Sequence, residues 1–466
     1  MFLPVRSKVR RGTMSRQRRV FLITGVLLAV VPAARAQTLT LRQAIDGALG
    51  RNPQVALAHA DVQAAGAAAS MARTALLPQL NFMEDISRGD DPVYVFGTEL
   101  RQQRFTQADF SLDSLNRPTP IGNFATRFGG QWRLFDGWAS EERLHSAHLE
   151  AQSADAMAGA VNQGIVLQVV QAYQAVLYAQ REIDIAQHQE RTAEALLHDA
   201  QSHVKAGLAV NSDVLAAQVN LAERQQERIA AEGEQDTAWE ELETAMGATS
   251  GQALGSRPML QPLEAKEFPD EVLADDIAAG LKARPDLEAL RSAIEAQQSG
   301  VRAAKADFLP QVGAYGNWEM DRQTFAGSGG DNWVAGVALS LDILPLAKRA
   351  RLRQEQAAQQ KAEAQEQSAE LQIRLAVERA YTGHHTAASM LATARAAMEQ
   401  SAESLRILRN RYNAGLATMT DLLRAGDAER QSQNDYWRAA YGNTVSYAAL
   451  LYATGRLTPD SAETLQ

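Results

Sequence analysis

The sequence contains two copies of the same short motifs at fixed separations. A segment that begins at Asn52 resembles one that begins at Arg284, because each opens on a residue followed by proline and each closes on Leu-Pro-Gln. Further along, Ala-Gly-Leu-Ala stands at residues 206–209 and again at 414–417. Two blocks that each align without gaps indicate a duplicated structural unit. We therefore expect a first repeat at residues 37–250, a linker rich in Gly and Pro at 251–268, and a second repeat at 269–466.

Each repeat also contains a long segment in which apolar or small residues recur at alternating steps of four and three. The series runs from Ile165 to Val204 in the first repeat and from Ala380 to Tyr412 in the second. Such a 3.5-residue period is typical of helices that pack along a coiled-coil seam. One helix over residues 138–206 would be about 100 Å long at 1.5 Å per residue, too long for an ordinary globular domain. Each repeat should therefore hold a long helical hairpin.

Between the Leu-Pro-Gln motif and the long helix, each repeat has two segments that alternate apolar with polar or small residues. In residues 124–134 the even positions are mostly apolar, and the segments around Leu80, Val312 and Trp333 alternate in the same way. Strands with one apolar and one polar face suit either a sheet covered by a soluble core or a barrel that faces lipid. Four tryptophans near these segments favour a membrane interface: Trp132, Trp138, Trp318 and Trp333.

The N-terminus has the features of an export signal. Three arginines at residues 16–19 precede an apolar run at 20–31, and Ala34-Arg35-Ala36 forms an A-x-A cleavage pattern, so residues 1–36 are expected to be a cleaved signal peptide. Cleavage removes eight of the 46 basic residues and none of the 55 acidic ones, so the formal net charge falls from −9 to −17. That charge argues against a nucleic-acid partner. No later apolar run is long enough for a transmembrane helix, so any membrane crossing must use the strands.

The two Ala-Gly motifs are suited to reverse the long helices. Gly207 and Gly415 can take the left-handed conformation that ends a helix. Asn211-Ser212 and residues 418–420 offer side-chain caps for the returning helices, with Asp213 and Asp421 in the first turn or at the cap.

Together these motifs, with the "WRLFDGW" segment before the long helix, make the chain resemble the TolC-like outer-membrane efflux proteins (outer membrane factors) from Leu39 to Leu457. The resemblance implies a mainly α fold with a β-barrel part, built from a duplicated unit of helices, two strands and a long helical hairpin. It implies a homotrimer in the outer membrane of a Gram-negative bacterium. Its twelve-stranded barrel would continue into an α-helical coiled-coil barrel in the periplasm. Independently, four strands cannot close a barrel, and open sheet edges cannot face lipid.

The resemblance also assigns roles at the periplasmic tip. It implies a hydrogen bond between Asp213 and Tyr412 that holds the tip closed, and it places Asp421 at the constriction. Arg424 stands where a second acidic residue is known in the family, and Ala417 stands where an arginine is known. From the residues alone, Asp213 and Asp421 are also explained as helix caps, and Tyr412 as seam packing. Residues 84–122, the excess of the first repeat over the second, are expected to form an extended loop outside the cell.

Three functions remain open at this stage. The first is an outer-membrane duct that carries small molecules such as drugs and toxic compounds, together with a periplasmic adaptor and an inner-membrane pump, of the RND type by preference. The second is a duct for type I protein secretion, and the third is a periplasmic coiled-coil scaffold without a pore. No catalytic, cofactor or metal site is predicted, because the eight histidines form no ligand motif and the glycines near Phe325 lie in a strand-to-strand loop.

Overall fold

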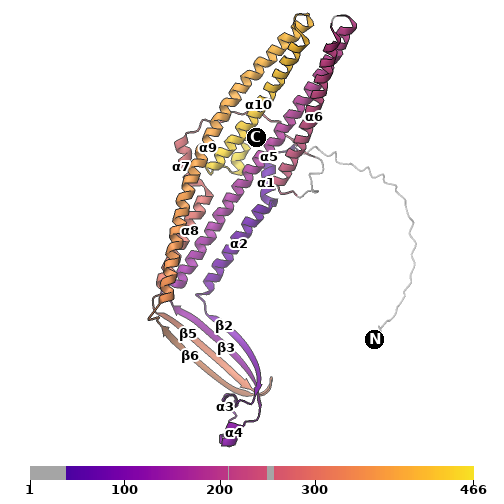
Figure 1. Ribbon diagram of the computed structural model, residues 1–466. Helices are drawn as coiled ribbons and strands as arrows, with labels where there is room; N and C mark the ends of the chain where they lie inside the picture. Colours follow the sequence, from indigo (N-terminus) through magenta and orange to yellow (C-terminus); the bar gives the residue numbers. More distant parts are fainter. Residues whose placement is uncertain (1–37, 208, 249–256, 466) are drawn as a thin grey trace, which may run out of the picture. The chain divides into compact units, whose positions relative to one another are not determined.

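The computed structural model describes residues 38–207, 209–248 and 257–465 (Figure 1). The expected signal peptide lies outside these residues. Six elements follow one another in the first half and recur in the same order in the second, which confirms the predicted succession of helices, strands and hairpin. The first six are α1 (Leu41–Arg51), α2 (Pro53–Thr74), β2 (Gln79–Gly89), β3 (Ile121–Phe135), α5 (Ala139–Lys205) and α6 (Asn211–Ala245). Their counterparts are α7 (Leu273–Ala283), α8 (Pro285–Ala306), β5 (Gln311–Arg322), β6 (Gly329–Ser340), α9 (Leu346–Asn413) and α10 (Met419–Ala453).

The remaining elements join or end these units. The short strands β1 (Thr38–Leu39) and β4 (Met259–Leu260) pair in parallel, so part of the predicted linker belongs to a small sheet. Helix α11 (Pro459–Glu463) lies near the C-terminus. The extended loop expected at residues 84–122 does connect the first two long strands, but it is shorter than expected and contains helices, and its place outside the cell stays a prediction. Its ends belong to β2 and β3, and between them lie α3 (Pro92–Arg101), the 3₁₀ helix η1 (Gln107–Phe110) and α4 (Leu112–Asn116).

The two hairpins have nearly equal dimensions. Helices α5 and α9 have 67 and 68 residues, and the returning helices α6 and α10 have 35 residues each. The 3.5-residue seam is buried as predicted in α5, where Ile165, Val169 and Val176 are almost fully enclosed. No described helix carries an apolar stretch sufficient to cross a membrane.

The returning helices end at equivalent glycines in the two repeats. Gly247 and Gly455 end α6 and α10 with positive φ angles of 73° and 72°. A Cβ atom on Gly247 would come within 2.7 Å of the Asn52 backbone, and one on Gly455 within 2.8 Å of the Ala283 backbone. Each returning helix therefore ends against the X-Pro junction of its own repeat, where only glycine fits.

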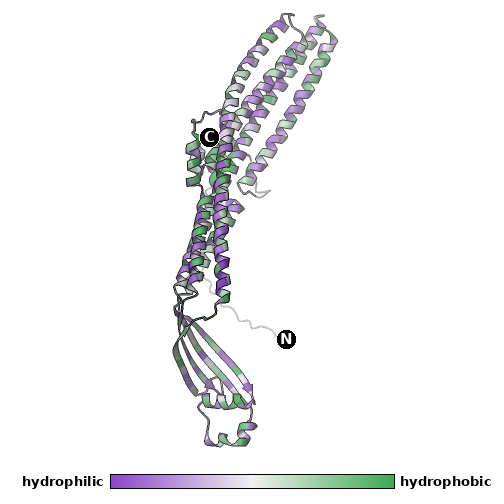
Figure 2. Ribbon diagram, turned by 60° about the vertical axis from the view of Figure 1, so that its left-hand side comes forward, coloured by the Kyte–Doolittle hydropathy of each residue, from purple (hydrophilic) through white to green (hydrophobic). Residues whose placement is uncertain are grey.

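The four long strands form one antiparallel sheet in the order β2-β3-β5-β6, with β2 and β6 at its edges. Register places Phe82, Phe128, Trp318 and Trp333 side by side in one row across all four strands. Apolar side chains on this face are exposed, and Figure 2 shows hydrophobic and hydrophilic residues mixed along each strand. The opposite face carries Arg127, Glu319 and other polar groups. The sheet thus has the two unlike faces that the alternation predicts.

Candidate functional site

Each of the two long helices ends at a glycine with a positive φ angle. Gly207 and Gly415 have φ angles of 76° and 74°. The Gly415 amide donates to the Tyr412 carbonyl at 2.9 Å, and the Leu416 amide donates to the Arg411 carbonyl at 2.8 Å, as in a Schellman motif. At the first tip the Gly207 amide donates in the same way to the Val204 carbonyl at 3.0 Å. Both glycines therefore take the left-handed conformation that lets the long helix stop and the chain turn back.

At the second tip, Asp421 belongs to a complete capping box. Its carboxylate accepts from the Thr418 amide at 3.1 Å and from the Thr418 hydroxyl at 2.7 Å, while its own amide donates to that hydroxyl at 3.2 Å. These hydrogen bonds, helped by the positive charges of Arg424 and Arg411, lower the pKa of Asp421. Arg424 itself is exposed on the next turn. Asp421 is thus a structural cap, and its remaining surface is open to solvent.

At the first tip, Asp213 occupies the same helix position without the same partner. The residue that caps α6 is Val210, whose side chain cannot accept a hydrogen bond, so the expectation that Asn211-Ser212 would cap this helix is wrong. Among the described residues, no hydrogen bond engages the Asp213 carboxylate in a cap. The carboxylate is half-buried and remains available for another donor.

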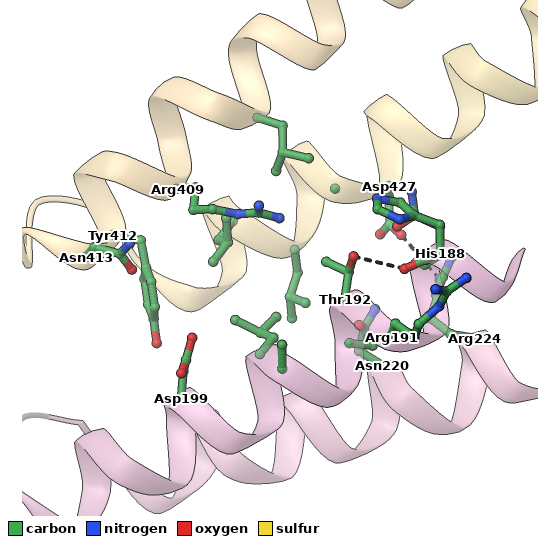
Figure 3. A pocket seen from close by; sticks show the side chains of 18 residues that line it. His188, Arg191, Thr192, Asp199, Asn220, Arg224, Arg409, Tyr412, Asn413 and Asp427 are labelled. Atoms are coloured by element: carbon green, nitrogen blue, oxygen red, sulfur yellow. Dashed lines mark hydrogen bonds and ion pairs between the residues drawn. The ribbon is translucent and has the colours of Figure 1, made fainter. Parts of the chain in front are cut away.

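Tyr412 lies between the hairpins. It packs on a small buried cluster of Ala200, Ala217 and Met419, and its ring centroid is 6.0 Å from that of His203. Figure 3 shows its hydroxyl and the Asp199 carboxylate pointing toward one another. Burial raises the pKa of Tyr412, and the negative charges of Asp213 and Asp199 raise it further. The hydroxyl therefore stays protonated near carboxylates, although the expected hydrogen bond to Asp213 is not among the hydrogen bonds of the described residues.

Behind Tyr412, a cavity of about 460 Å³ separates the two hairpins (Figure 3). Its walls come from α5 and α6 on one side and from α9 and α10 on the other. Leu196, Leu405 and Leu422 contribute apolar surface, and Arg191 and Arg409 contribute charge. The hairpins therefore touch at the tip cluster and diverge behind it.

At the end of this cavity away from Tyr412, where Arg224 and Asp427 form part of its wall, an ion-pair cluster joins the hairpins again (Figure 3). The Arg224 side chain on α6 is only 7% exposed, and its guanidinium lies 3.3 Å from Asp427 on α10 and 2.8 Å from Glu227 on its own helix. Glu227 also approaches Arg430 of α10 at 3.6 Å. Gln189 of α5 donates to Glu429 of α10 at 3.0 Å. These polar links cross from one hairpin to the other in the part of the chain that would have to move if the tips parted.

Arg224 is not among the residues predicted from the sequence, although the sequence contains a signal for it. Positions 217, 224, 231, 238 and 245 follow a strict seven-residue period along α6, and all except Arg224 are alanine. A long cation at a seam position needs an acidic partner on the neighbouring helix. That exception to the alanine seam identifies the link.

The four tryptophans lie at two levels of the sheet. Trp318 and Trp333 are opposite each other on β5 and β6, and the Trp318 ring is 5.8 Å from that of Phe128. Toward the helices, the Trp132 indole donates to the Leu76 carbonyl at 3.1 Å, and Trp138 stacks edge-on against Phe135 at 5.2 Å. Both levels present aromatic surface on or beside the exposed apolar face.

The sequence profile of the family described as "Outer membrane efflux protein" matches residues 44–248 and 277–456. The chain belongs to this family. The expected resemblance is therefore confirmed, and the protein acts as a duct in the outer membrane and reaches into the periplasm. A family of channels gives no support to the pore-less scaffold.

Relatives of the chain include proteins of secretion as well as of efflux. It is 28% identical over 436 residues to protein CyaE of Bordetella pertussis, covering 90% of this chain and 83% of the relative. It is 25% identical over 424 residues to the alkaline protease secretion protein AprF of Pseudomonas aeruginosa, covering 88% and 83%. The CmeC outer membrane channel of Campylobacter jejuni has the same fold, with a TM-score of 0.75 and 16% identity over 90% of this chain and 88% of CmeC.

Proposed function

We propose that three copies of this chain form one continuous duct for a tripartite export system. The carrying observation is the four-stranded sheet, whose β2 and β6 edges are unpaired and whose apolar face is exposed. In lipid an open edge leaves backbone groups without partners, so the edges must pair with those of other copies. Three copies supply twelve strands, a number that closes a membrane barrel.

The exposed faces of the helices support the same assembly. Leu371 and Met390 on α9 are more than half exposed although they lie on a long helix of a folded protein. Neighbouring chains would cover such residues by continuing the coiled-coil packing. A helix of 67 residues is about 100 Å long, so three pairs of hairpins can line a passage that extends far from the sheet.

In this assembly the apolar face of the sheet meets lipid and the polar face lines the lumen. The row from Phe82 to Trp333 and the group formed by Trp132, Phe135 and Trp138 would lie at the two membrane interfaces. On β3 these two levels are four to seven residues apart, from Phe128 to Trp132 and to Phe135, which is about 14–24 Å before tilt.

The tips are the proposed gate. Asp213 and Tyr412, within one chain or between chains, would hold the tips together, and three Asp421 carboxylates would form a ring at the axis. Arg424 would offset part of that negative field. A periplasmic adaptor and an inner-membrane pump would open the gate by binding the separated tips more tightly than the closed ones.

For the cargo we propose small molecules driven by an RND-type pump, in keeping with the family's description as efflux proteins. Type I protein secretion is the second candidate, and the similarity to AprF favours it. Neither role requires catalysis by this chain. Deletion of the gene separates the two cargo classes. Loss of dye extrusion and of drug tolerance is expected for efflux, whereas loss of a protein from the culture medium with unchanged tolerance supports secretion.

The assembly itself is tested on protein extracted with detergent. Its mass should equal three chains plus bound detergent, and it should form ion channels in planar bilayers. A stable monomer that salt washing removes from membranes would refute the proposed duct.

A further inference from the structure

The segment between β2 and β3 folds back onto the polar face of the sheet. In the first part of β3 the buried residues are Ile121, Asn123 and Ala125, whereas the residues between them are half-buried. These three lie on the same face as Arg127, because side chains alternate along a strand. Val95 and Thr98 of α3 are buried in turn, and α3 contacts β5 and β6. Figure 1 shows α3 at the end of the sheet away from the long helices.

Hydrogen bonds tie the end of α3 to two strands. The Gln102 amide donates to the Asn123 side-chain oxygen at 2.9 Å and to the Gly122 carbonyl at 3.0 Å. Asn123 donates in turn to the Asp321 carboxylate of β5 at 2.5 Å. Gln102, Asn123 and Asp321 are all buried, so this chain of side chains has been withdrawn from water where a lumen would otherwise hydrate it.

A second set of contacts joins Arg101 to β5 and β6. The Arg101 guanidinium lies 3.7 Å from Glu319 of β5, which also pairs with Arg127 at 2.9 Å. The Arg101 carbonyl accepts from the Asn332 amide at 3.3 Å. Opposite this carbonyl stands Gly330, and a Cβ atom there would collide with the Arg101 backbone. The segment thus fits the sheet closely through backbone as well as side chains.

From this arrangement we propose that residues 90–120 form a lid inside the outer mouth of the duct, a second barrier at the end opposite the tips. The proposal rests on the proposed function, in which the polar face lines the lumen. Three lids would then narrow one mouth. Gln102 and Arg101 would decide how readily cargo leaves and how readily molecules enter from outside.

The docked lid has the features of a contact that can open. Among the described residues, Asp321 Oδ2 and Gln102 Oε1 are buried without a hydrogen-bond partner. A buried acceptor without a donor is costly, and lifting the lid would return both to water. Docking is therefore opposed by desolvation, and cargo pressing outward would break the contacts described above together with the hydrogen bond from Gln103 to the Asp331 carbonyl.

The chain has no cysteine, so single introduced cysteines report on the lid without interference. Ala125→Cys places a thiol on a residue that is fully buried under the lid, and Gln131→Cys places one on the exposed part of the same face. Intact cells are treated with a charged maleimide that does not cross membranes. Ala125→Cys should react slowly in the otherwise native chain. Arg101→Ala with Gln102→Ala should raise its rate by about tenfold or more, because local opening controls access to buried groups.

Leu112→Ser is the matched control, since Leu112 belongs to α4 of the same segment and is 79% exposed. It should leave the Ala125→Cys rate unchanged. The Arg101→Ala, Gln102→Ala protein without cysteines should also conduct more current in planar bilayers, and its trimer should keep the parent's resistance to heat. Equal labelling of Ala125→Cys in the parent and the double variant, with equal conductance, would overturn the lid. If Gln131→Cys stays unreactive in every background, the polar face is not a water-filled lumen, and the proposed duct fails together with the lid.

Discussion

Replacement of Arg224 by methionine should weaken the closed state of the hairpins. Methionine keeps most of the buried stem of the arginine and removes the charge that links α6 to Asp427 of α10. The three acidic partners of Arg224, which are Glu223, Glu227 and Asp427, are 36–58% exposed and can turn toward water once the guanidinium is gone. The substitution therefore removes the link and the buried charge together, whereas Asp427→Ala would keep a buried guanidinium that pairs, among the described residues, only with Glu223 and Glu227 of its own helix.

The expected size follows from this exposure. A buried ion pair can contribute several kcal/mol, but Asp427 is 51% exposed, so we take the value of a screened pair, about 1 kcal/mol for each chain. If three chains open together, the closed state loses about 3 kcal/mol. Since each 1.4 kcal/mol corresponds to a factor of ten, the ratio of open to closed channels should rise about a hundredfold.

Single-channel recording in planar bilayers measures this ratio directly. Arg395→Met is the control, because Arg395 is exposed on α9 and, within the part of the chain that the structure describes, forms an ion pair only with Glu399 one turn away. It makes the same chemical change without touching the link between hairpins. Asp427→Asn should add little to Arg224→Met if both act on one contact. An open fraction for Arg224→Met within twofold of the parent and of Arg395→Met would refute the assigned role.

Three further predictions concern the tips and the ends of the hairpins. Asp213→Ala with Tyr412→Phe should raise single-channel conductance, while Asp421→Ala should mainly reduce cation preference and block by multivalent cations. If the conductance of the double variant and the ion selectivity of Asp421→Ala both equal those of the parent, these residues serve only in helix capping and packing. Gly247→Ala should lower the yield of folded trimer, because the φ angle of Gly247 is positive and an added Cβ atom would meet the Asn52 backbone. Gly426→Ala is the control, since an added Cβ atom in the interior of α10 meets no neighbouring atom. Thermal unfolding should show this control to be neutral or stabilised by up to about 1 kcal/mol. The pKa of Asp421 is lowered in the folded chain, so its cap stabilises the fold above the unfolded pKa of about 3.9, and this stability is lost as the pH falls through the lower folded pKa. Hydrogen exchange at the start of α10 should therefore accelerate at acid pH in the parent. It should vary less with pH in Asp421→Asn.

The regular part of the fold was predictable because its cause is local in the sequence. The steps of four and three from Ile165 to Val204 determine which face of α5 is buried, and proline at residues 53 and 285 fixes where one helix ends and the next begins. Alternation likewise determines the two faces of the sheet. The helices between β2 and β3 were not predictable in this way. Their burial depends on contacts with β5 and β6, more than 200 residues away in the chain.

At the candidate site, residue types alone predicted the turns at the tips but not the interaction partners of the charged side chains. The turns at Gly207 and Gly415 could be predicted because glycine adopts a positive φ angle without strain, whatever its partners in the fold. Arg224 required knowledge of which helix lies opposite, because its partner Asp427 is on the other hairpin. Asp213 and Asp421 occur in the same motif, and their difference depends on the residue three positions earlier, Val210 in one case and Thr418 in the other.

The difference between Val210 and Thr418 gives the aspartates of two otherwise equivalent turns different roles. In the second repeat, the Thr418 hydroxyl and amide occupy one oxygen of Asp421, and the hydrogen bonds hold the first turn of α10 in place. In the first repeat, valine provides no such partner, so Asp213 keeps a half-buried carboxylate, whose negative charge raises the pKa of Tyr412. A carboxylate used as a cap cannot change partners without fraying its helix, whereas an uncapped one can bind a hydroxyl in the closed state and water in the open state. Val210→Thr should therefore convert Asp213 into a cap, stabilise α6, and raise conductance, as is expected for Asp213→Ala with Tyr412→Phe. A conductance equal to that of the parent, with slower hydrogen exchange at α6 proving that the cap has formed, would show that Asp213 takes no part in closing the tip.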